Sequence, residues 1–326
     1  MRVSVLMSVY NENVALANKA IKSILNQSFR DFEFIIIVDN PENTAIIDLI
    51  ESKRKEDHRI RCYINNINIG LTKSLNKGLQ FCTGDYIARM DADDISLHDR
   101  LQEQCDFLDK NPNVGLCSTN FSFIDDNDEI LTDNVVGDRL HSSWLVLNNP
   151  IAHPSVMFRR EILKVRQPLY NENYKYSQDI ELWCYLVLHD INIRILQRNL
   201  FSYRVSPSQI SHSHKKQQSE FSKQVHRDFI IGYLRNVNVI EGGSNVNLFD
   251  IVEKLDFAIY NGKVSIDCYI EKILLVIYYS VITSNFRYIF KYMFNRNLYV
   301  LRLPLKFSVY LLFQRIFKNK WKSLQF

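Results

Sequence analysis

Three carboxylates crowd into four residues of this chain, directly after an apolar segment. The stretch Ala88–Asp94, ARMDADD, contains Asp91, Asp93 and Asp94, and a single small residue, Ala92, separates the first two. Carboxylates this close repel one another and raise each other's pKa, whereas a hard divalent cation removes that penalty and can also bridge phosphates. The cluster therefore indicates a site for Mg²⁺ or Mn²⁺. The alternative is a solvated acidic turn that caps the following helix.

Alternating strands and helices lead up to this cluster. Segments rich in β-branched residues alternate with segments of helical periodicity, which is typical of βαβ units. The expected strands are Val3–Val9, Phe32–Val38, Ile60–Ile64 and Asp85–Met90, and the expected helices are Val14–Leu25, Thr44–Lys55 and Leu71–Cys82. The pattern predicts the α/β fold class.

Polar residues follow three of the expected strands. Tyr10–Glu12 comes after the first strand, Asp39 after the second, and Asp91–Asp93 after the fourth. In open α/β sheets, ligands bind in the crevice outside the carboxyl ends of the strands. We therefore expect these three loops to line one site.

The chain beyond the acidic cluster continues with elements of both kinds. We expect helices at Leu101–Leu108 and Gln178–Leu188 and strands at Val114–Ser118 and Ser155–Phe158. The segment Glu241–Asn247, EGGSNVN, holds two adjacent glycines and several turn formers, and is the best linker candidate. A chain of 326 residues exceeds the usual size of one core. We predict a catalytic domain over residues 1–240 and a mostly helical segment over residues 241–326.

Composition narrows the class of protein. Hydrophobic residues make up 46% and charged residues 23%, which is ordinary globular usage and excludes a disordered or fibrous chain. The six cysteines lie far apart without a CxxC pair, which argues against a zinc site and a secreted disulfide framework and favours a reducing cytoplasm. The opening MRVSVLMSVYNEN is typical of a first strand rather than a signal peptide.

Six segments of the chain, in order, resemble the motifs of family 2 glycosyltransferases. They are SVLMSVYNEN, the strand end at Asp39, NIGLTKSLNKGL, GDYIARMDADDIS, HPSVMFRR and SQDIELW, and they span roughly residues 1–210. The short Asp-Ala-Asp resembles the DXD metal motif of that family. The resemblance implies a Rossmann-like GT-A fold, a nucleotide-sugar donor with uridine as the first expectation, and a divalent metal, Mn²⁺ or Mg²⁺.

The resemblance also assigns roles to residues. The donor-binding positions are Val9, Tyr10, Glu12, Asp39, Asn68, Arg89, Asp91 and Ala92, and the metal ligands are Asp91, Asp93 and His212. These roles are chemically consistent, because Tyr10 offers a stacking face for a pyrimidine and Asp39 can accept a base N–H. The alternative is that Tyr10 and Asp39 merely finish strands and cap turns.

Asp179 matches the position of the family's catalytic base. Inverting transfer needs one carboxylate that accepts the proton of the acceptor hydroxyl while a metal steadies the departing diphosphate. The alternative is an ordinary helix N-terminal aspartate that offsets the macrodipole. For His212 the alternative is a solvent-exposed loop histidine, and His153 is expected to support an acceptor-side loop.

Three positions depart from the family pattern. Ser8 stands where proline is common, Asp39-Asn40-Pro41 replaces the frequent Asp-Asp-Gly, and Leu75 replaces an arginine before Asn76. The first two bear on which nucleobase is bound, and the third bears on contacts to the donor.

The C-terminal tail differs in chemistry from the body. Lys272–Phe326 contains ten Lys or Arg, no Asp or Glu and 14 aromatic residues. The whole chain has a net charge of +4, so the residues before this tail have a net charge of −6. Its apolar run Ile273–Ile282 is far shorter than the roughly 20 residues that span a bilayer. Basic and aromatic side chains suit a surface helix on anionic lipid, which places the enzyme on the inner face of the plasma membrane. The alternative is a helical subdomain packed on the catalytic domain; nucleic-acid binding fits only the charge.

Three functions remain in view at this point. The first is transfer of one sugar to a glycan on a polyprenyl lipid, such as a capsule or O-antigen repeat unit, because the chain lacks the QxxRW motif and membrane spans of processive synthases. The second is a nucleotidyltransferase, but SVYNENVALA lacks the expected glycine-rich, lysine-containing phosphate loop. The third is an inactive sugar-nucleotide-binding module, which would have lost acidic residues that are present here.

Overall fold

The computed structural model describes residues 1–137, 145, 149, 151–206 and 215–236. The chain divides into two compact units, Met1–Phe229 and Ile230–Phe326. Our expected boundary at residue 240 and the basic tail lie outside the described residues and stay predictions. Across the part of the chain that is described, no helix is both long and apolar enough to cross a bilayer.

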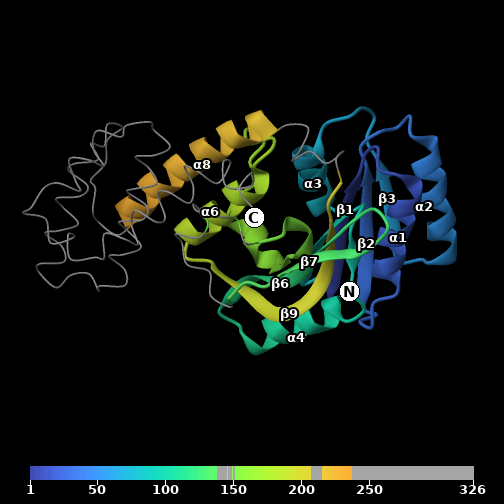
Figure 1. Ribbon diagram of the computed structural model, residues 1–326, viewed down its shortest axis with the longest axis horizontal. Helices are drawn as coiled ribbons and strands as arrows, with labels where there is room; N and C mark the ends of the chain where they lie inside the picture. The colour runs from blue at the N-terminus through green and yellow to red at the C-terminus, as the bar shows by residue number, and fades with distance from the viewer. Residues whose placement is uncertain (138–144, 146–148, 150, 207–214, 237–326) are drawn as a thin grey trace, which may run out of the picture. The chain divides into compact units, whose positions relative to one another are not determined.

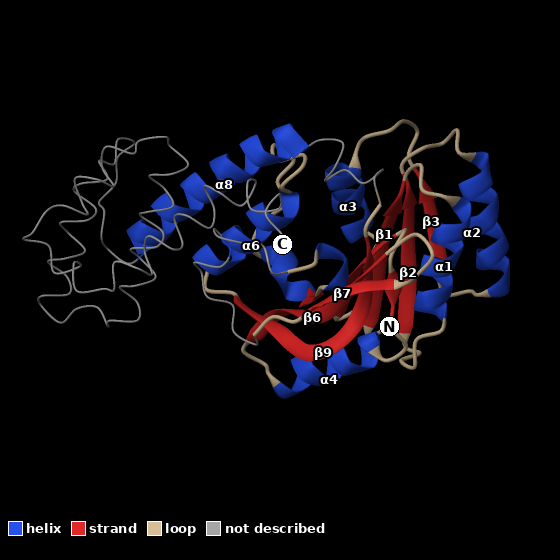
Figure 2. Ribbon diagram, viewed as in Figure 1, coloured by secondary structure: helices blue, strands red, loops and turns tan. Residues whose placement is uncertain are grey.

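A mixed sheet forms the centre of the first unit (Figures 1 and 2). Its order is β3-β2-β1-β4-β8-β6-β9-β5, and β7 pairs with β6. The first four strands along the chain are β1 (Val3–Val9), β2 (Phe32–Val38), β3 (Ile60–Ile64) and β4 (Tyr86–Asp91), which pair in parallel. The later strands are β5 (Ile95–Ser96), β6 (Val114–Ile124), β7 (Ile130–Asn134), β8 (Met157–Arg159) and β9 (Asn192–Arg204).

Helices cover both faces of the parallel half of the sheet. Helices α1 (Val14–Leu25) and α2 (Thr44–Glu56) lie on one face and α3 (Leu71–Leu79) on the other, as Figure 1 shows. The remaining helices are α4 (Arg100–Lys110), α6 (Gln178–Leu188) and α8 (Lys215–Asn236), with short 3₁₀ turns at His153–Ser155 and Arg160–Lys164. Every residue of β1 and β2 is buried, as expected for parallel strands covered on both faces.

Local chemistry sets where the helices begin. The Asn13 side chain accepts a hydrogen bond from the backbone N–H of Ala15 at 2.8 Å and so caps α1. Asn43 caps α2 in the same way through the N–H of Ile46 at 3.3 Å. Both caps follow strand ends, so the turns that start these helices also form the edge of the sheet where ligands are expected.

Most expected elements are confirmed, with some corrections. The expected strand Ser155–Phe158 is wrong at its start, because Pro154 holds residues 153–155 in a 3₁₀ turn and β8 begins only at Met157. The expected helix Leu71–Cys82 ends at Leu79, and the expected strand Val114–Ser118 continues to Ile124. Strands β5, β7 and β9 and helix α8 were not anticipated.

Candidate active site

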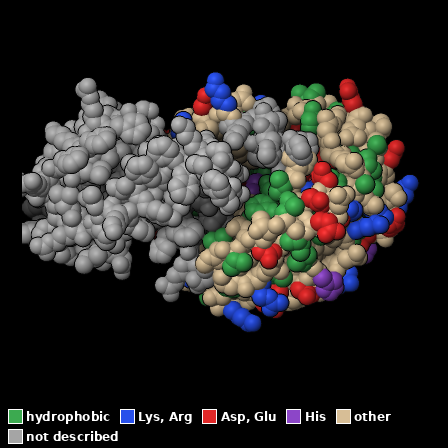
Figure 3. Space-filling view, viewed as in Figure 1, with side chains coloured by type: hydrophobic (Ala, Val, Ile, Leu, Met, Phe, Trp, Pro, Cys, Tyr) green, Lys and Arg blue, Asp and Glu red, His purple; other side chains and the backbone are tan. Residues whose placement is uncertain are grey.

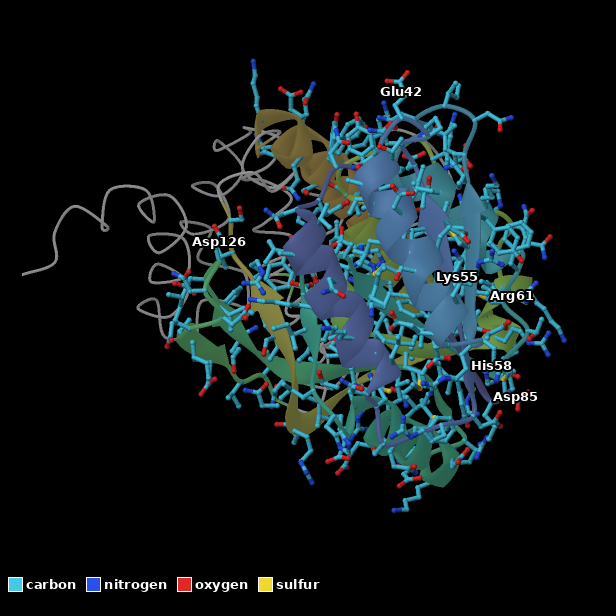
Figure 4. The ribbon with its side chains drawn as sticks, turned by 90° about the vertical axis from the view of Figure 1, so that its right-hand side faces the viewer. Glu42, Lys55, His58, Arg61, Asp85 and Asp126 are labelled. Carbon is cyan, nitrogen blue, oxygen red and sulfur yellow. The ribbon has the colours of Figure 1, made fainter. Side chains whose placement is uncertain are left out.

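The carboxyl ends of the parallel strands gather at one edge of the sheet. Figure 4 labels Glu42, in the connection after β2, at one end of the molecule, and His58 and Asp85, which precede β3 and β4, towards the opposite end. Strands β1 and β2, and β1 and β4, are parallel neighbours, and the Asp39 N–H donates to the Val9 carbonyl, so the residues that follow these strands lie at the same edge of the sheet. Figure 3 shows acidic and hydrophobic side chains lying next to one another on one face of the molecule.

The acidic cluster forms at the end of β4. One carboxylate oxygen each from Asp91, Asp93 and Asp94 can be chosen so that all lie within 4.8 Å of one another. Asp94 is only 1% exposed; its Oδ1 accepts the backbone N–H of Arg204 at 2.7 Å, and its Oδ2 has no partner among the described residues. Ala92, between Asp91 and Asp93, is buried.

Burial and mutual repulsion raise the pKa values around this cluster. Burial, followed by repulsion from Asp91, raises the pKa of Asp93 to about 6, and burial, followed by repulsion from Asp93, raises the pKa of Asp94 well above its ordinary value. Burial also raises the pKa of Glu12 to about 7, with smaller contributions from Asp93 and Asp91. A buried carboxylate oxygen without a donor, in a set of hard oxygen ligands, fits a divalent cation.

A buried arginine lies beside the cluster. Arg89, on β4 and 2% exposed, pairs through Nη2 with Asp91 Oδ1, while its Nε and Nη1 have no hydrogen-bond partner among the described residues. Its charge lowers the pKa of both Asp179 and His153, although burial is the larger influence on each. Arg89 is thus close enough to act electrostatically both on the acidic cluster and on Asp179 and His153.

Asp39 is buried and engaged by its own chain. Its Oδ1 accepts the Asn65 side-chain amide at 2.7 Å and the Ile69 N–H at 2.9 Å, and its Oδ2 accepts the Gly70 N–H at 2.8 Å. The Asn68 side chain accepts the same Gly70 N–H at 2.9 Å. Gly70 has φ +86°, a conformation that favours glycine. Asp39 therefore shapes the loop that carries Asn68.

The turn after β1 presents an exposed aromatic ring. Tyr10 is 42% exposed, its N–H donates to Glu12 Oε2 at 2.6 Å, and its carbonyl accepts the Asn43 side-chain amide at 3.1 Å. Val9 is buried and its carbonyl accepts the Asp39 N–H at 2.7 Å, so its side chain cannot reach a ligand. Leu75 is also buried, which removes donor contacts from that position.

Asp179 lies in the first turn of α6, as predicted. Its Oδ2 accepts the Asn149 side-chain amide at 3.0 Å, and burial raises its pKa, which makes it a stronger base. His153 is buried, bonds through Nε2 to the Tyr170 hydroxyl at 2.9 Å, and has a pKa that burial lowers well below its ordinary value. His153 is therefore a neutral supporting residue, and the proposed ligand His212 lies outside the described residues.

Sequence reasoning missed three contributors, Arg204, Asn65 and Asn149, which hold predicted site residues in place. These three carry no local signal, because each meets its partner only after folding. Asp94 was noted in the acidic cluster from the sequence but was not assigned a role as a metal ligand, and the structure places its carboxylate with those of Asp91 and Asp93.

Comparison with known protein families shows which family this chain belongs to. The family model described as glycosyl transferase family 2 matches residues 4–166, which is half of the chain. The chain belongs to this family. It is therefore a glycosyltransferase, and the resemblance noted from its motifs is confirmed.

Curated relatives agree. An uncharacterized glycosyltransferase of Methanocaldococcus jannaschii is 34% identical over 206 residues, which cover 62% of this chain and 70% of that protein. The O-antigen biosynthesis glycosyltransferase WbnJ of Escherichia coli is 30% identical over 207 residues, which cover 62% of this chain and 79% of that protein.

Solved structures show the fold. S. aureus TarS 1–349 in complex with UDP has a TM-score of 0.56 at 16% identity, with 88% of this chain and 92% of that chain covered. The complex of the same protein with UDP-GlcNAc gives a TM-score of 0.57 at 15% identity and the same coverage. This likeness confirms the expected GT-A fold for the family 2 enzyme.

Proposed function

We propose that this family 2 enzyme is an inverting, metal-dependent transferase that moves one sugar from a UDP-sugar to a glycan acceptor. The observation that carries the proposal is the acidic cluster at the end of β4, with a buried carboxylate oxygen that lacks a partner among the described residues. The UDP and UDP-GlcNAc complexes of TarS support a uridine donor.

The donor diphosphate would be held at this cluster. Asp91 and Asp93 are the proposed metal ligands, with Asp94 as a further oxygen donor and His212 as an additional candidate. A bound Mn²⁺ or Mg²⁺ supplies charge that stabilises the departing diphosphate. Arg89 Nε and Nη1, which have no partner among the described residues, lie beside Asp91 and would donate hydrogen bonds to the sugar nucleotide.

The nucleoside would lie over the turn after β1. The exposed ring of Tyr10 provides the stacking face, and the loop that Asp39 shapes carries Asn68 within the same crevice. Glu12 closes the turn through the Tyr10 N–H, so it would act on the ring's placement rather than on the donor directly.

Asp179 would accept the proton of the acceptor hydroxyl as that oxygen attacks the anomeric carbon. Its raised pKa suits this task, because a base works best when its pKa lies near the operating pH. One such base is enough for a single displacement, which inverts the anomeric configuration. Asn149 holds the carboxylate through Oδ2.

The acceptor would be a lipid-linked surface glycan. The O-antigen relative WbnJ supports this class, and the basic aromatic residues of Lys272–Phe326 would bring the enzyme to an anionic membrane on its cytoplasmic face. The full chain should then float with vesicles that contain phosphatidylglycerol and stay behind with phosphatidylcholine alone. Equal behaviour with both vesicles contradicts membrane contact through charge.

A donor panel tests the proposed function. Release of nucleoside diphosphate from UDP-glucose, UDP-galactose, UDP-GlcNAc and GDP-mannose would be measured with Mn²⁺, with Mg²⁺ and with EDTA. We expect turnover of one UDP-sugar that EDTA abolishes, and NMR of the glycoside product should show the inverted anomeric configuration.

The control is Asp106→Asn, an exposed carboxylate on α4 that bonds only to Gln102 among the described residues. It should keep full turnover, whereas Asp93→Asn should lose it. Turnover that persists in EDTA, or a product with retained configuration, contradicts the mechanism while leaving the family assignment intact.

A further inference from the structure

Arg204, the last residue of β9, makes a set of contacts that ends on the acidic cluster. Its side chain is fully buried. Its Nε donates to the backbone carbonyl of Asp93 at 2.7 Å, and its own N–H donates to Asp94 Oδ1 at 2.7 Å. Two consecutive residues of the cluster are thus held by one arginine, 111 and 110 positions away in the sequence.

The other side of the guanidinium is fixed to the turn between β6 and β7. Nη1 donates to the Asp125 carbonyl, and Nη2 donates to Asp128 Oδ1 at 2.5 Å. Asp128 Oδ2 also pairs with Lys19 Nζ of α1 at 2.5 Å. The guanidinium therefore joins the acidic segment, the β6–β7 turn and α1.

That turn is itself well braced. Asp125 Oδ1 accepts the N–H groups of Asn127 at 2.8 Å and Glu129 at 2.9 Å, and the Asp125 carbonyl accepts the Asp128 N–H at 3.1 Å. Asp128 adopts φ +70°, a left-handed conformation in which aspartate is one of the better tolerated residues. A braced turn gives the guanidinium a fixed point to bond against.

We propose that Arg204 is a positioning residue for the metal-binding carboxylates; the inference rests on the proposed function. The hydrogen bond from Arg204 Nε to the Asp93 carbonyl fixes the peptide plane between Asp93 and Asp94. It therefore also fixes the directions in which both side chains leave the backbone. Groups behind the ligands of a metal typically change its affinity by 10- to 100-fold. The planar fork of arginine can meet Asp93, Asp125 and Asp128 together, whereas a lysine ammonium cannot span them.

Charge reinforces this arrangement. A buried guanidinium is costly unless it is paired, and here Asp128 pairs with it directly while Asp93 and Asp94 lie beside it.

Two variants and one matched control test the proposal. Arg204→Lys keeps the charge and loses the fork, and Asp128→Asn weakens the guanidinium's anchor while leaving Arg204 in place. The control is Arg198→Lys, an arginine on the same strand whose partner is Glu103 on α4 at 3.2 Å. Mn²⁺ affinity would be measured on the full chain by electron paramagnetic resonance of free Mn²⁺, with UDP present, alongside kcat and the KM for Mn²⁺.

We expect Arg204→Lys to weaken Mn²⁺ binding tenfold or more, in keeping with the usual effect of groups behind metal ligands. Asp128→Asn should weaken Mn²⁺ binding by a smaller factor, because Arg204 itself stays in place. The KM for Mn²⁺ should rise more than kcat falls, and Arg198→Lys should bind like the wild type. Unchanged Mn²⁺ affinity in Arg204→Lys overturns the inference.

If Arg204→Lys does not fold, Asp128→Asn decides, and wild-type Mn²⁺ affinity in that variant overturns the inference. Failure of the proposed function can be told apart from failure of this inference. If the proposed metal dependence is wrong, the wild-type chain itself binds no Mn²⁺, whereas the inference alone fails if the wild type binds Mn²⁺ and the variants bind it equally well.

Discussion

One residue type does four different things in this enzyme, and the surroundings of each aspartate determine which. Asp39 accepts three hydrogen bonds from its own chain and serves structure. Asp94 keeps a buried oxygen without a described partner, Asp128 anchors a guanidinium, and Asp179 carries a raised pKa at a helix start. A carboxylate oxygen that lacks a donor is costly to bury, so Asp94 indicates where a ligand belongs.

Asp179→Asn should separate binding from chemistry. The amide is nearly isosteric but cannot accept a proton, so we expect kcat to fall by about 10² or more, the usual contribution of a general base. Binding of UDP-sugar, measured by calorimetry, should stay unchanged, because the proposed donor contacts lie at the ends of β1, β2 and β4. Transfer at the wild-type rate removes Asp179 from the mechanism.

At the scale of elements, periodicity predicts what local residues determine. The bounds of β1, α1, β2, β3 and α6 follow directly from apolar patterns and caps. Strand β9 escaped because its sequence NIRILQRNLFSYR puts polar residues among apolar ones, and its register along β6 shifts. Strand β7 escaped because its exposed residues show no buried face. Such strands owe their existence to long-range pairing.

Close packing of α3 on the sheet depends on one glycine. A Cβ on Gly78 would lie 2.3 Å from Leu6 Cδ1 and 3.0 Å from Ile37 Cγ1. Gly78→Val should therefore lower the free energy of unfolding by about 1–3 kcal/mol through overpacking, measured by urea denaturation.

Lys73→Val on the same helix is the matched control, because Lys73 is exposed and the new side chain meets only solvent. We expect it to cost less than about 1 kcal/mol, the scale of helix propensity alone. Equal losses at the two positions would show that packing against β1 and β2 is not the cause.

At the scale of the whole molecule, the site combines residues from distant parts of the chain. The strand-end residues were predictable, because parallel strands end at one edge and the motifs stand in family order. Asn149 and Arg204 were not, because they reach Asp179 and the acidic cluster from segments that no local pattern connects to them. Prediction from sequence thus found the residues expected to meet substrate and missed those that hold them.

The same site should make stability depend on metal and pH together. In the metal-free protein the pKa of Asp93 is raised to about 6 and that of Glu12 to about 7. These groups favour the folded state when protonated, so their contribution is complete below the unfolded pKa values and is lost as pH rises through about 6 to 7. A cation relieves the resulting repulsion, so Mg²⁺ should raise the melting temperature more at pH 8 than at pH 5.

Thermal melts in Mg²⁺ and in EDTA at the two pH values check this expectation, and Asp93→Asn should shrink the difference between them. A shift in melting temperature that is equal at both pH values, or larger at pH 5, argues against a cation bound by these carboxylates.

The grip of Asp39 on the loop before α3 acts on main-chain N–H groups, those of Ile69 and Gly70. Every residue except proline has such a group, so the hydrogen bond at position 69 does not depend on which side chain is present there. The conformation of that loop therefore depends on a carboxylate thirty positions upstream, through contacts that do not involve the loop's own side chains at positions 69 and 70.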